Sequence, residues 1–197
     1  MKRFLLLLIC FLPTIILSQK KLRDSVIVNA DIFKIIYSEK LQQPLSVKYN
    51  VQCPSGSASR KGLDFFTCDS ILTSDGKDYD NNVWDKGHMA PAADFNCTRE
   101  LMKKTFTYLN CTLQHQDLNR TTWRLLETYE RSLALKYKVV SVEVICEFTK
   151  SSKVLPSGAT IPDGYYKIIK YNNTTETYYF KNEKPSSTDY KKYQLKG

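Results

Sequence analysis

A short polar stretch, residues 84–91 with the sequence WDKGHMAP, constrains this chain more than any other part of it. It contains His88, one of only two histidines among the 197 residues. A histidine side chain accepts a proton near neutral pH, and Pro91 limits the backbone that follows. A polar, glycine-containing stretch is a poor fit for a buried apolar surface. We therefore predict a strand and a following loop that present His88 as a general base, with a structural histidine as the alternative.

Two more segments follow this stretch in order: residues 110–114 read NCTLQ, and residues 118–127 read LNRTTWRLLE. Together the three segments resemble the DNA/RNA non-specific endonucleases of the ββα-metal (His-Me finger) superfamily, whose motifs are DRGHxAP, NxxPQ and LNxxxWxxLE. The resemblance is tight from about residue 84 to residue 133 and looser elsewhere. Two positions depart from the family pattern, because Lys86 stands where the family usually has Arg and Leu113 where it usually has Pro.

The resemblance implies a fold and an activity. The fold would be α+β, a central antiparallel sheet flanked by helices, with a ββα-metal motif that carries the active site. The activity would be Mg²⁺-dependent hydrolysis of DNA and RNA phosphodiester bonds without sequence specificity, leaving 5′-phosphate ends, with Mn²⁺ as a second candidate metal. The partners implied are DNA and RNA substrates, and the sequence identifies no protein partner.

The resemblance also implies roles for individual residues. His88 would take the proton of the attacking water, and Asn119 would bind the metal through its amide oxygen, a hard ligand suited to Mg²⁺. Asn110 would orient the site by hydrogen bonding. Helical spacing predicts that Asn119, Trp123 and Glu127 lie along one stripe. Glu127 would then hold metal-bound waters or a neighbouring residue, and Trp123 would pack the helix against the sheet. Outside this motif, helix capping would be the simpler role for Asn119.

Three cationic residues complete the candidate site. Lys86 lies next to the proposed base and could contact the scissile phosphate, as a point charge where Arg would give a bidentate fork. Arg60 resembles an upstream family Arg that contacts phosphate, although a solvated loop cation is an equal alternative. Arg131 matches a family position, and its simplest role is an i, i+4 ion pair with Glu127.

The composition fits one globular domain with a polyanionic partner. At 42% hydrophobic residues, a chain of this length can bury a core. The net charge of +9 favours nucleic acid, acidic polysaccharide or an anionic membrane, but it serves solubility equally well. A catalytically degenerate polyanion-binding protein is therefore the alternative function, favoured by Lys86 and Leu113 and opposed by the set His88, Asn119 and Glu127. A toxin nuclease domain is a third interpretation.

Residues 1–18 are predicted to be a signal peptide. A basic start is followed by an apolar run over residues 4–17, which is shorter than the roughly 20 residues that a membrane-spanning helix needs. We therefore expect a single exported domain, residues 19–197, that is secreted or periplasmic and has no stable membrane association after cleavage.

The N-x-S/T sequons begin at Asn96, Asn110, Asn119, Asn172 and Asn173. Two of these residues belong to the proposed site, and a glycan on Asn119 would block metal binding. We therefore predict a bacterial export route without sequon glycosylation.

Five cysteines follow the leader: Cys53, Cys68, Cys97, Cys111 and Cys146. Export permits disulfides, and an odd number leaves at least one thiol unpaired within the monomer. A weak first guess pairs Cys53 with Cys68, across a Ser/Gly/Pro loop. The cysteine spacings do not suggest a zinc site.

Hydrophobic periodicity and turn residues predict short strands with a few helices. We expect strands or extended segments at residues 19–42, 45–51, 63–68, 139–148, 165–171 and 176–180. We expect helices at 98–109 and 117–137, the second capped by Asp117, with an irregular segment at 110–116 between them and an exposed or disordered polar tail from 181.

Overall fold

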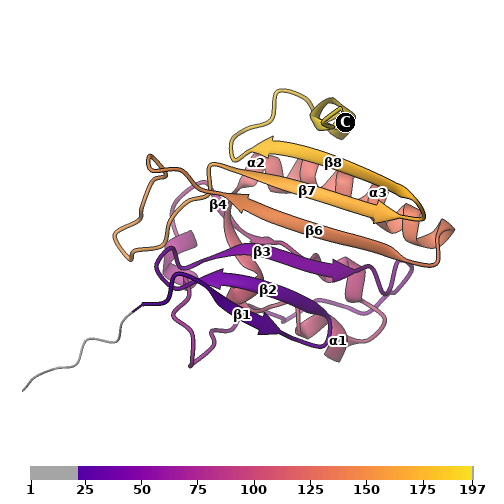
Figure 1. The fold of residues 1–197 in the computed structure, drawn as a ribbon. Coiled ribbons are helices and arrows are strands. Elements are labelled where there is room, and N and C mark those ends of the chain that lie inside the picture. Colours follow the sequence, from indigo (N-terminus) through magenta and orange to yellow (C-terminus); the bar gives the residue numbers. More distant parts are fainter. Residues whose placement is uncertain (1–21, 197) are drawn as a thin grey trace, which may run out of the picture.

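A six-stranded antiparallel sheet forms the frame of the molecule in the computed structural model, which describes residues 22–196 (Figure 1). The predicted signal peptide lies outside the described residues. The order across the sheet is β1 (Val26–Asn29), β2 (Phe33–Ser38), β3 (Gln43–Asn50), β6 (Val140–Glu147), β7 (Gly164–Tyr171) and β8 (Thr174–Lys181).

A second, two-stranded sheet leads into the main helix. Strands β4 (Trp84–His88) and β5 (Cys111–His115) pair antiparallel, and the chain then enters α2 (Gln116–Leu118), a π-helical turn η4 (Asn119–Trp123) and α3 (Arg124–Lys136). This is a ββα arrangement. The short elements are α1 (Arg99–Lys103) and the 3₁₀ turns η1 (Gly76–Tyr79), η2 (Ala92–Phe95), η3 (Tyr108–Asn110) and η5 (Tyr190–Tyr193).

Helix α3 covers one face of the half of the main sheet that contains β6, β7 and β8 (Figure 1). Strand β6 alternates buried and half-buried residues, as expected for a strand that lies between two neighbours and has one face in the core. Trp123 is fully buried and joins the helix to the sheet, with its ring centroid 5.5 Å from Tyr165 and 5.7 Å from Phe180. The docking of α3 onto the sheet therefore depends on this side chain.

A buried ion pair lies in the same interface. Lys167 on β7 places its Nζ 2.8 Å from Glu130 Oε2 on α3, and both side chains are inaccessible to solvent. Tyr49 donates a hydrogen bond of 2.9 Å to Glu130 Oε1. Lys167 Nζ also lies 4.6 Å from the centroid of the Trp123 ring. Sheet and helix are thus held by a charged contact as well as by apolar packing.

Several predicted elements differ from the structure, because tertiary contacts outweigh local preference. The helix predicted over residues 98–109 begins after its Thr98 cap but ends at Lys103. The Thr105 hydroxyl donates a hydrogen bond to the Met102 carbonyl. The backbone of Phe106 and Tyr108 then hydrogen-bonds with Phe66 instead of continuing the helix. Residues 63–68 form only isolated bridges where a strand was predicted.

The segment around the second motif was also mispredicted. The stretch expected to be irregular contains β5, whose residues pair with β4 in register from Trp84–His115 to His88–Cys111. The following helix starts at Gln116, so its cap is His115, whose Nδ1 accepts from the Asp117 amide, and the predicted Asp117 cap is wrong.

Both ends of the described chain are more ordered than predicted. Residues 22–42 contain two strands, β1 and β2, where one edge strand or arm was expected. The polar tail packs against the core: Tyr193 stacks on Phe180 at 4.8 Å, and Tyr190 stacks on Tyr129 at 5.3 Å. None of the helices within residues 22–196 has the length and apolar character needed to cross a membrane.

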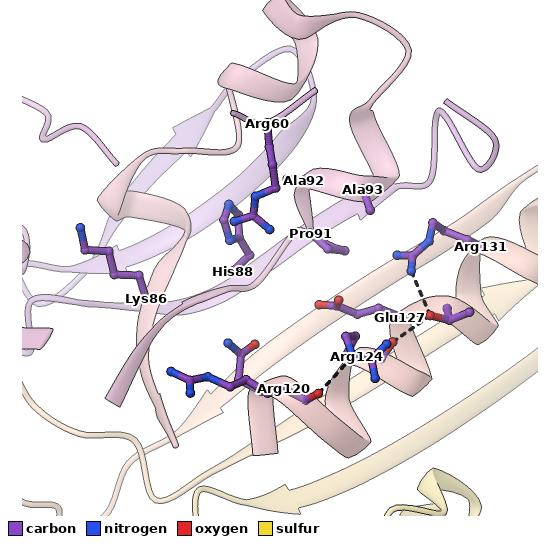
Figure 2. Close-up of a pocket in the computed structure, with 12 residues that line it drawn as sticks. Arg60, Lys86, His88, Pro91, Ala92, Ala93, Arg120, Arg124, Glu127 and Arg131 are labelled. Atoms are coloured by element: carbon purple, nitrogen blue, oxygen red, sulfur yellow. Dashed lines mark hydrogen bonds between the residues drawn. The ribbon is translucent and has the colours of Figure 1, made fainter. Parts of the chain in front are cut away.

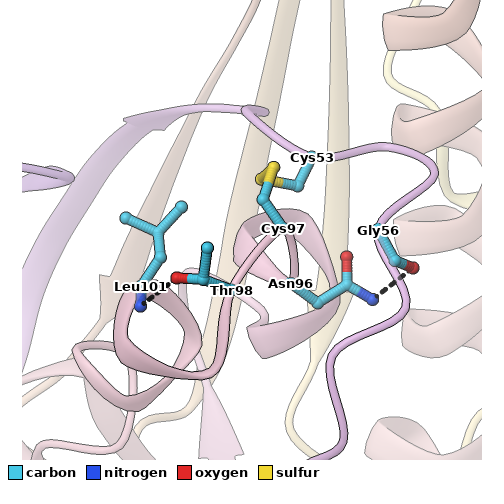
Figure 3. The surroundings of a disulfide bond; sticks show 6 residues. All are labelled: Cys53, Gly56, Asn96, Cys97, Thr98 and Leu101. Carbon is cyan, nitrogen blue, oxygen red and sulfur yellow. Dashed lines mark hydrogen bonds between the residues drawn. A yellow bond between two sulfur atoms is a disulfide. The ribbon is translucent and has the colours of Figure 1, made fainter.

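The disulfide joins Cys53 to Cys97, so the guessed pairing with Cys68 is wrong (Figure 3). The two Cα atoms lie 5.3 Å apart because the Cys53 amide bonds the Asp94 carbonyl and brings the chain against η2. Asn96 adds a side-chain bond of 2.8 Å to the Gly56 carbonyl. The loop that follows Cys53 is therefore fastened to the segment after His88. The free cysteines of the described chain are Cys68, Cys111 and Cys146.

Candidate active site

A cleft of about 520 Å³ lies between helix α3, with the η4 turn before it, and the segment around His88 (Figure 2). Five cations and one carboxylate line it, so the cleft is suited to a polyanion. Its lining consists of Arg60, Lys86, His88, Pro91, Ala92, Ala93, Asn119, Arg120, Arg124, Glu127, Thr128 and Arg131. Every predicted site residue except Asn110 lies on this surface.

His88 is fixed at the end of β4 by aromatic rings. Its ring centroid lies 4.6 Å from Phe65 and 4.8 Å from Phe106, the latter in an edge-to-face contact. The Nε2 atom is buried and has no hydrogen-bond partner among the described residues. Burial, followed by the charge of Arg60, lowers the pKa of His88 to about 3. The imidazole is therefore neutral throughout the physiological pH range.

Asn110 is fully buried behind the cleft and holds the residues after His88. Its Oδ1 accepts from the Ala90 amide at 2.8 Å, and its Nδ2 donates to the Ala90 carbonyl at 2.9 Å and to the Thr105 carbonyl at 3.0 Å. Its own carbonyl accepts from the Met89 amide. Asn110 thus acts on the backbone next to His88 and does not reach the cleft itself.

Two positions of the β4–β5 ribbon have clear packing reasons. A Cβ atom at Gly87 would lie 2.5 Å from the Gln114 side chain, so only glycine permits this close pairing of the strands. Leu113, which replaces the family Pro, donates its backbone N–H to Gln43 Oε1 at 3.2 Å, a bond that proline could not make. The departure at Leu113 therefore adds a contact between the ribbon and the main sheet.

The Asn119 side chain is oriented by Asp85 on β4. Asn119 Nδ2 donates a hydrogen bond to Asp85 Oδ2 at 2.9 Å. Arg120 donates to both oxygens of the same carboxylate, from Nε to Oδ2 at 2.9 Å and from Nη2 to Oδ1 at 2.6 Å. The amide nitrogen is thereby committed to Asp85, which leaves the Asn119 amide oxygen for another partner. Asn119 does not cap a helix N-terminus, because it has helical dihedral angles and lies at the C-terminal end of α2, where the π-helical turn begins.

The predicted stripe of Asn119, Trp123 and Glu127 agrees in part with the structure, because Asn119 and Glu127 share the cleft and the Trp123 side chain interacts with Glu127. Asn119 and Glu127 line the cleft, whereas Trp123 is buried against the main sheet. The segment from Asn119 to Trp123 is a π-helical turn with an i→i+5 pattern, in place of the regular helix that the spacing assumes. Such turns are frequent at functional sites because they redirect a side chain without ending the helix.

Glu127 faces the cleft from α3, on the side of the helix turned toward His88 (Figure 2). Burial is the main cause that raises its pKa to about 7, and the neighbouring Glu130 acts in the same direction. The charges of Lys167 and Arg131 act against this rise. Glu127 therefore exchanges a proton near neutral pH.

Arg131 was expected to pair with Glu127, and this expectation is wrong. Its Nη1 donates to Asp94 Oδ1 at 3.0 Å, and its Nη2 donates to Thr128 Oγ1 at 3.1 Å. Asp94 is fully buried in η2 and presents a carboxylate directly to the guanidinium, whereas Glu127 turns into the cleft. The pair joins α3 to the segment after His88.

The other two predicted cations differ in how freely they face the cleft. Figure 2 shows Arg60 beside His88, and its guanidinium carbon lies 5.5 Å from the Phe106 ring centroid. Lys86 extends away from His88 in the same view. Its Nζ lies 3.1 Å from Asp64 Oδ1, so a phosphate at Lys86 would compete with an existing ion pair.

A family model of the DNA/RNA non-specific endonucleases matches residues 17–197 of this chain. The chain belongs to the DNA/RNA non-specific endonuclease family. Among curated relatives, the mitochondrial nuclease of Saccharomyces cerevisiae is 34% identical over 162 residues, which cover 72% of this chain and 49% of the yeast protein. The mitochondrial nuclease EXOG of Danio rerio is 36% identical over 90 residues, which cover 44% of this chain and 26% of the fish protein.

A solved structure has the same fold as this chain. The crystal structure of the EndoG/EndoGI complex superposes with a TM-score of 0.77 at 22% identity, covering 86% of this chain and 80% of the other. The predicted α+β fold, a mostly antiparallel sheet with a few helices, is therefore confirmed. This chain spans less than half the length of the curated relatives named above.

The residues around Asn119 fit a divalent metal ion, on which nucleases of this family depend. The Asn119 amide oxygen is left free by the Asp85 bond, and the Glu127 carboxylate supplies another oxygen in the same cleft. Residues 22–196 contain no group of three or more His, Cys, Asp and Glu side chains that could hold a metal. A cation here would therefore depend on few protein oxygens and on water, as Mg²⁺ sites commonly do.

Three residues of this endonuclease site, Arg120, Arg124 and Asp94, were not singled out from the sequence, and the partner of Asp85 was not identified. Arg120 and Arg124 line the cleft, Asp85 orients Asn119, and Asp94 holds Arg131. The spacing of Arg120 and Arg124, four residues apart before Arg131, was a visible signal for a basic helix face. Asp94 had no such signal, because its partner lies 37 residues away in the sequence.

Proposed function

We propose that this protein is an endonuclease that hydrolyses phosphodiester bonds of DNA and RNA without sequence specificity. In this proposal His88 is the general base, and Asn119 holds one divalent metal ion, Mg²⁺. One observation carries the proposal: the ββα arrangement brings His88, Asn119 and Glu127 to a single cleft lined by five cations. Family membership supports the same reaction class.

The chemistry begins with an activated water. The His88 imidazole is neutral at physiological pH and held in one orientation by Phe65 and Phe106, so it can take the proton of a water that attacks phosphorus. Asn110 keeps the following backbone in place. Attack on one side of phosphorus with departure of the 3′-oxygen would leave a 5′-phosphate end.

The cationic walls of the cleft receive the charge of the nucleic acid. Arg60 lies next to His88, and Arg120, Arg124 and Arg131 line the cleft from the η4 turn and helix α3 (Figure 2). A metal ion bound at Asn119 would stabilise negative charge on the phosphoryl oxygens and the leaving oxygen. Because these contacts are made to phosphate and not to bases, we expect little sequence preference and a steep loss of affinity with salt.

Cleavage of two substrates tests the proposal. Purified protein is incubated with supercoiled plasmid and with RNA, in Mg²⁺ and in EDTA, and the product ends are tested for a 5′-phosphate by ligation. We expect both substrates to be cut in Mg²⁺ and neither in EDTA. Salt-sensitive binding without cleavage under Mg²⁺ or Mn²⁺ would replace the proposal with a degenerate polyanion-binding protein.

We also propose that the protein is exported by a bacterial route as a single domain, residues 19–197. The disulfide between Cys53 and Cys97 supports an oxidising compartment, because such bonds persist mainly outside the cytosol. Mass spectrometry of the protein recovered from periplasm and medium tests this proposal. Recovery only in the cytosol, with residues 1–18 still attached, would contradict it.

A further inference from the structure

The contact between Asp94 and Arg131 joins the two halves of the cleft. Asp94 belongs to η2, six residues after His88, and Arg131 belongs to α3, one helical turn after Glu127. Arg131 Nη1 lies 3.0 Å from Asp94 Oδ1, with the Arg side chain 18% exposed and the Asp side chain fully buried. Burial, followed by the nearby Glu130, raises the pKa of the Asp94 carboxyl, and the Arg131 guanidinium donates a hydrogen bond to this buried group.

Asp94 is held more rigidly than a loop residue normally is. Its backbone amide donates to the Pro91 carbonyl at 3.0 Å, and its carbonyl accepts from the amides of Gln52 at 3.1 Å and Cys53 at 2.9 Å. The disulfide from Cys53 to Cys97 closes the same region three residues later. The Asp94 carboxylate therefore lies at a fixed point relative to His88.

Arg131 has donors left over for a ligand. A guanidinium carries five N–H donors, and the bonds to Asp94 and Thr128 use one donor each. Arg131 also lines the cleft on the side where Glu127 lies (Figure 2). Fixing a long, flexible side chain strengthens ligand binding, because its rotamers are already restricted and less conformational entropy is lost when the ligand binds.

We propose that Asp94 is a positioning residue that holds the Arg131 guanidinium at the cleft wall, in the orientation in which Arg131 binds a phosphate group of the nucleic acid. Asp94 acts through Arg131 and does not itself contact the substrate. This inference deepens the proposed function and rests on it, since it requires nucleic acid in the cleft.

A double-mutant cycle in binding tests the proposal. The affinity of full-length protein for a fluorescein-labelled 12-base-pair DNA duplex is measured by anisotropy in EDTA, so that cleavage does not interfere. We expect Arg131→Ala and Asp94→Ala each to raise Kd roughly tenfold. The double variant should bind like Arg131→Ala alone, and each variant should lower the salt slope of log Kd by about 1.

Two further variants keep the test decisive. Asp94→Asn retains the size of the side chain and one acceptor oxygen, so it replaces Asp94→Ala if that variant does not fold. We expect Asp94→Asn to lose less affinity for DNA than Asp94→Ala, and to lose none when Arg131→Ala is already present. Glu39→Gln is the matched control, because Glu39 is another buried carboxylate paired with an arginine, Arg23, outside the cleft. We expect it to lower Tm and leave Kd unchanged.

The failures can be told apart. Additive losses in the double variant, or an unchanged Kd and salt slope for Asp94→Asn, would overturn the role of Asp94 while leaving the endonuclease proposal intact. Failure of the wild-type protein to bind the duplex at low salt would overturn the proposed function and this inference with it.

Discussion

At the residue scale, burial decides the protonation of the proposed base. His88 lies between Phe65 and Phe106, and burial together with the Arg60 charge lowers its pKa to about 3. An imidazole that stays neutral down to this pH does not lose its function as a base between pH 8 and pH 5. Any fall in activity over that range must come from other groups, and Glu127 titrates within it.

The pKa of His88 can be measured directly, because the chain has only two histidines. In an NMR titration of the imidazole C–H signals, with His115→Gln for assignment, we expect His88 to titrate at about 3. Arg60→Ala should raise this pKa, because it removes a positive charge that disfavours the imidazolium. A His88 that titrates near 6.5 in both proteins would show that neither burial nor Arg60 acts as described.

Glu127 is expected to lower stability at neutral and alkaline pH. Its pKa is raised from 4.5 to about 7 in the folded protein, so between these values the folded state holds a proton that the unfolded chain has lost. Stability therefore falls as pH rises through this window, and the full penalty is present above pH 7. Glu127→Gln should raise Tm more at pH 8 than at pH 5 and should slow cleavage. An equal change in Tm at both pH values would contradict this account.

At the element scale, the disulfide between Cys53 and Cys97 joins the loop after Cys53, which contains Arg60, to the segment after His88. It closes a separation of 44 residues, and a bond of this kind typically contributes about 2–4 kcal/mol to stability. We expect the double variant Cys53→Ser/Cys97→Ser to lose about that much free energy of unfolding in urea. Cys68→Ser, which removes a partly exposed free thiol, is the control and should lose little. Equal losses in the two proteins would mean that the bond does not stabilise the fold.

The elements also show what could be predicted from the sequence and what could not. Strand β6 and the hairpin of β7 and β8 were predictable, because β-branched runs and the Asn172-Asn173 turn are local signals. Strand β5 was missed because its pairing with β4 is a tertiary contact. The π-helical turn at Asn119 was missed because helical periodicity assumes one constant phase. The motif residues could be named, but the pairing of Asn119 with Asp85 and that of Arg131 with Asp94 could not, because the partners lie 34 and 37 residues apart in the sequence.

At the scale of the whole molecule, a charged contact joins the helix of the site to the main sheet. Lys167 and Glu130 form an ion pair of 2.8 Å that is inaccessible to solvent. Removing one member leaves a buried charge without its partner, which typically costs about 3–5 kcal/mol. We therefore expect Lys167→Met to lower the free energy of unfolding in urea by about that amount. Adding Glu130→Leu should restore much of the loss, and a single variant as stable as wild type would contradict this role.

The central claim is that His88 is the general base of a nuclease site built on the ββα arrangement, and a single-turnover measurement tests it most directly. Plasmid cleavage in Mg²⁺ is compared for wild type, His88→Ala and His115→Ala, with DNA binding in EDTA measured in parallel. We predict that His88→Ala slows cleavage by at least about 100-fold with binding retained, since general-base catalysis contributes factors of this size. His115→Ala, which removes a helix cap and a ring contact with Trp84 but no residue of the cleft lining, should cleave close to the wild-type rate. Cleavage by His88→Ala at the wild-type rate would contradict the account.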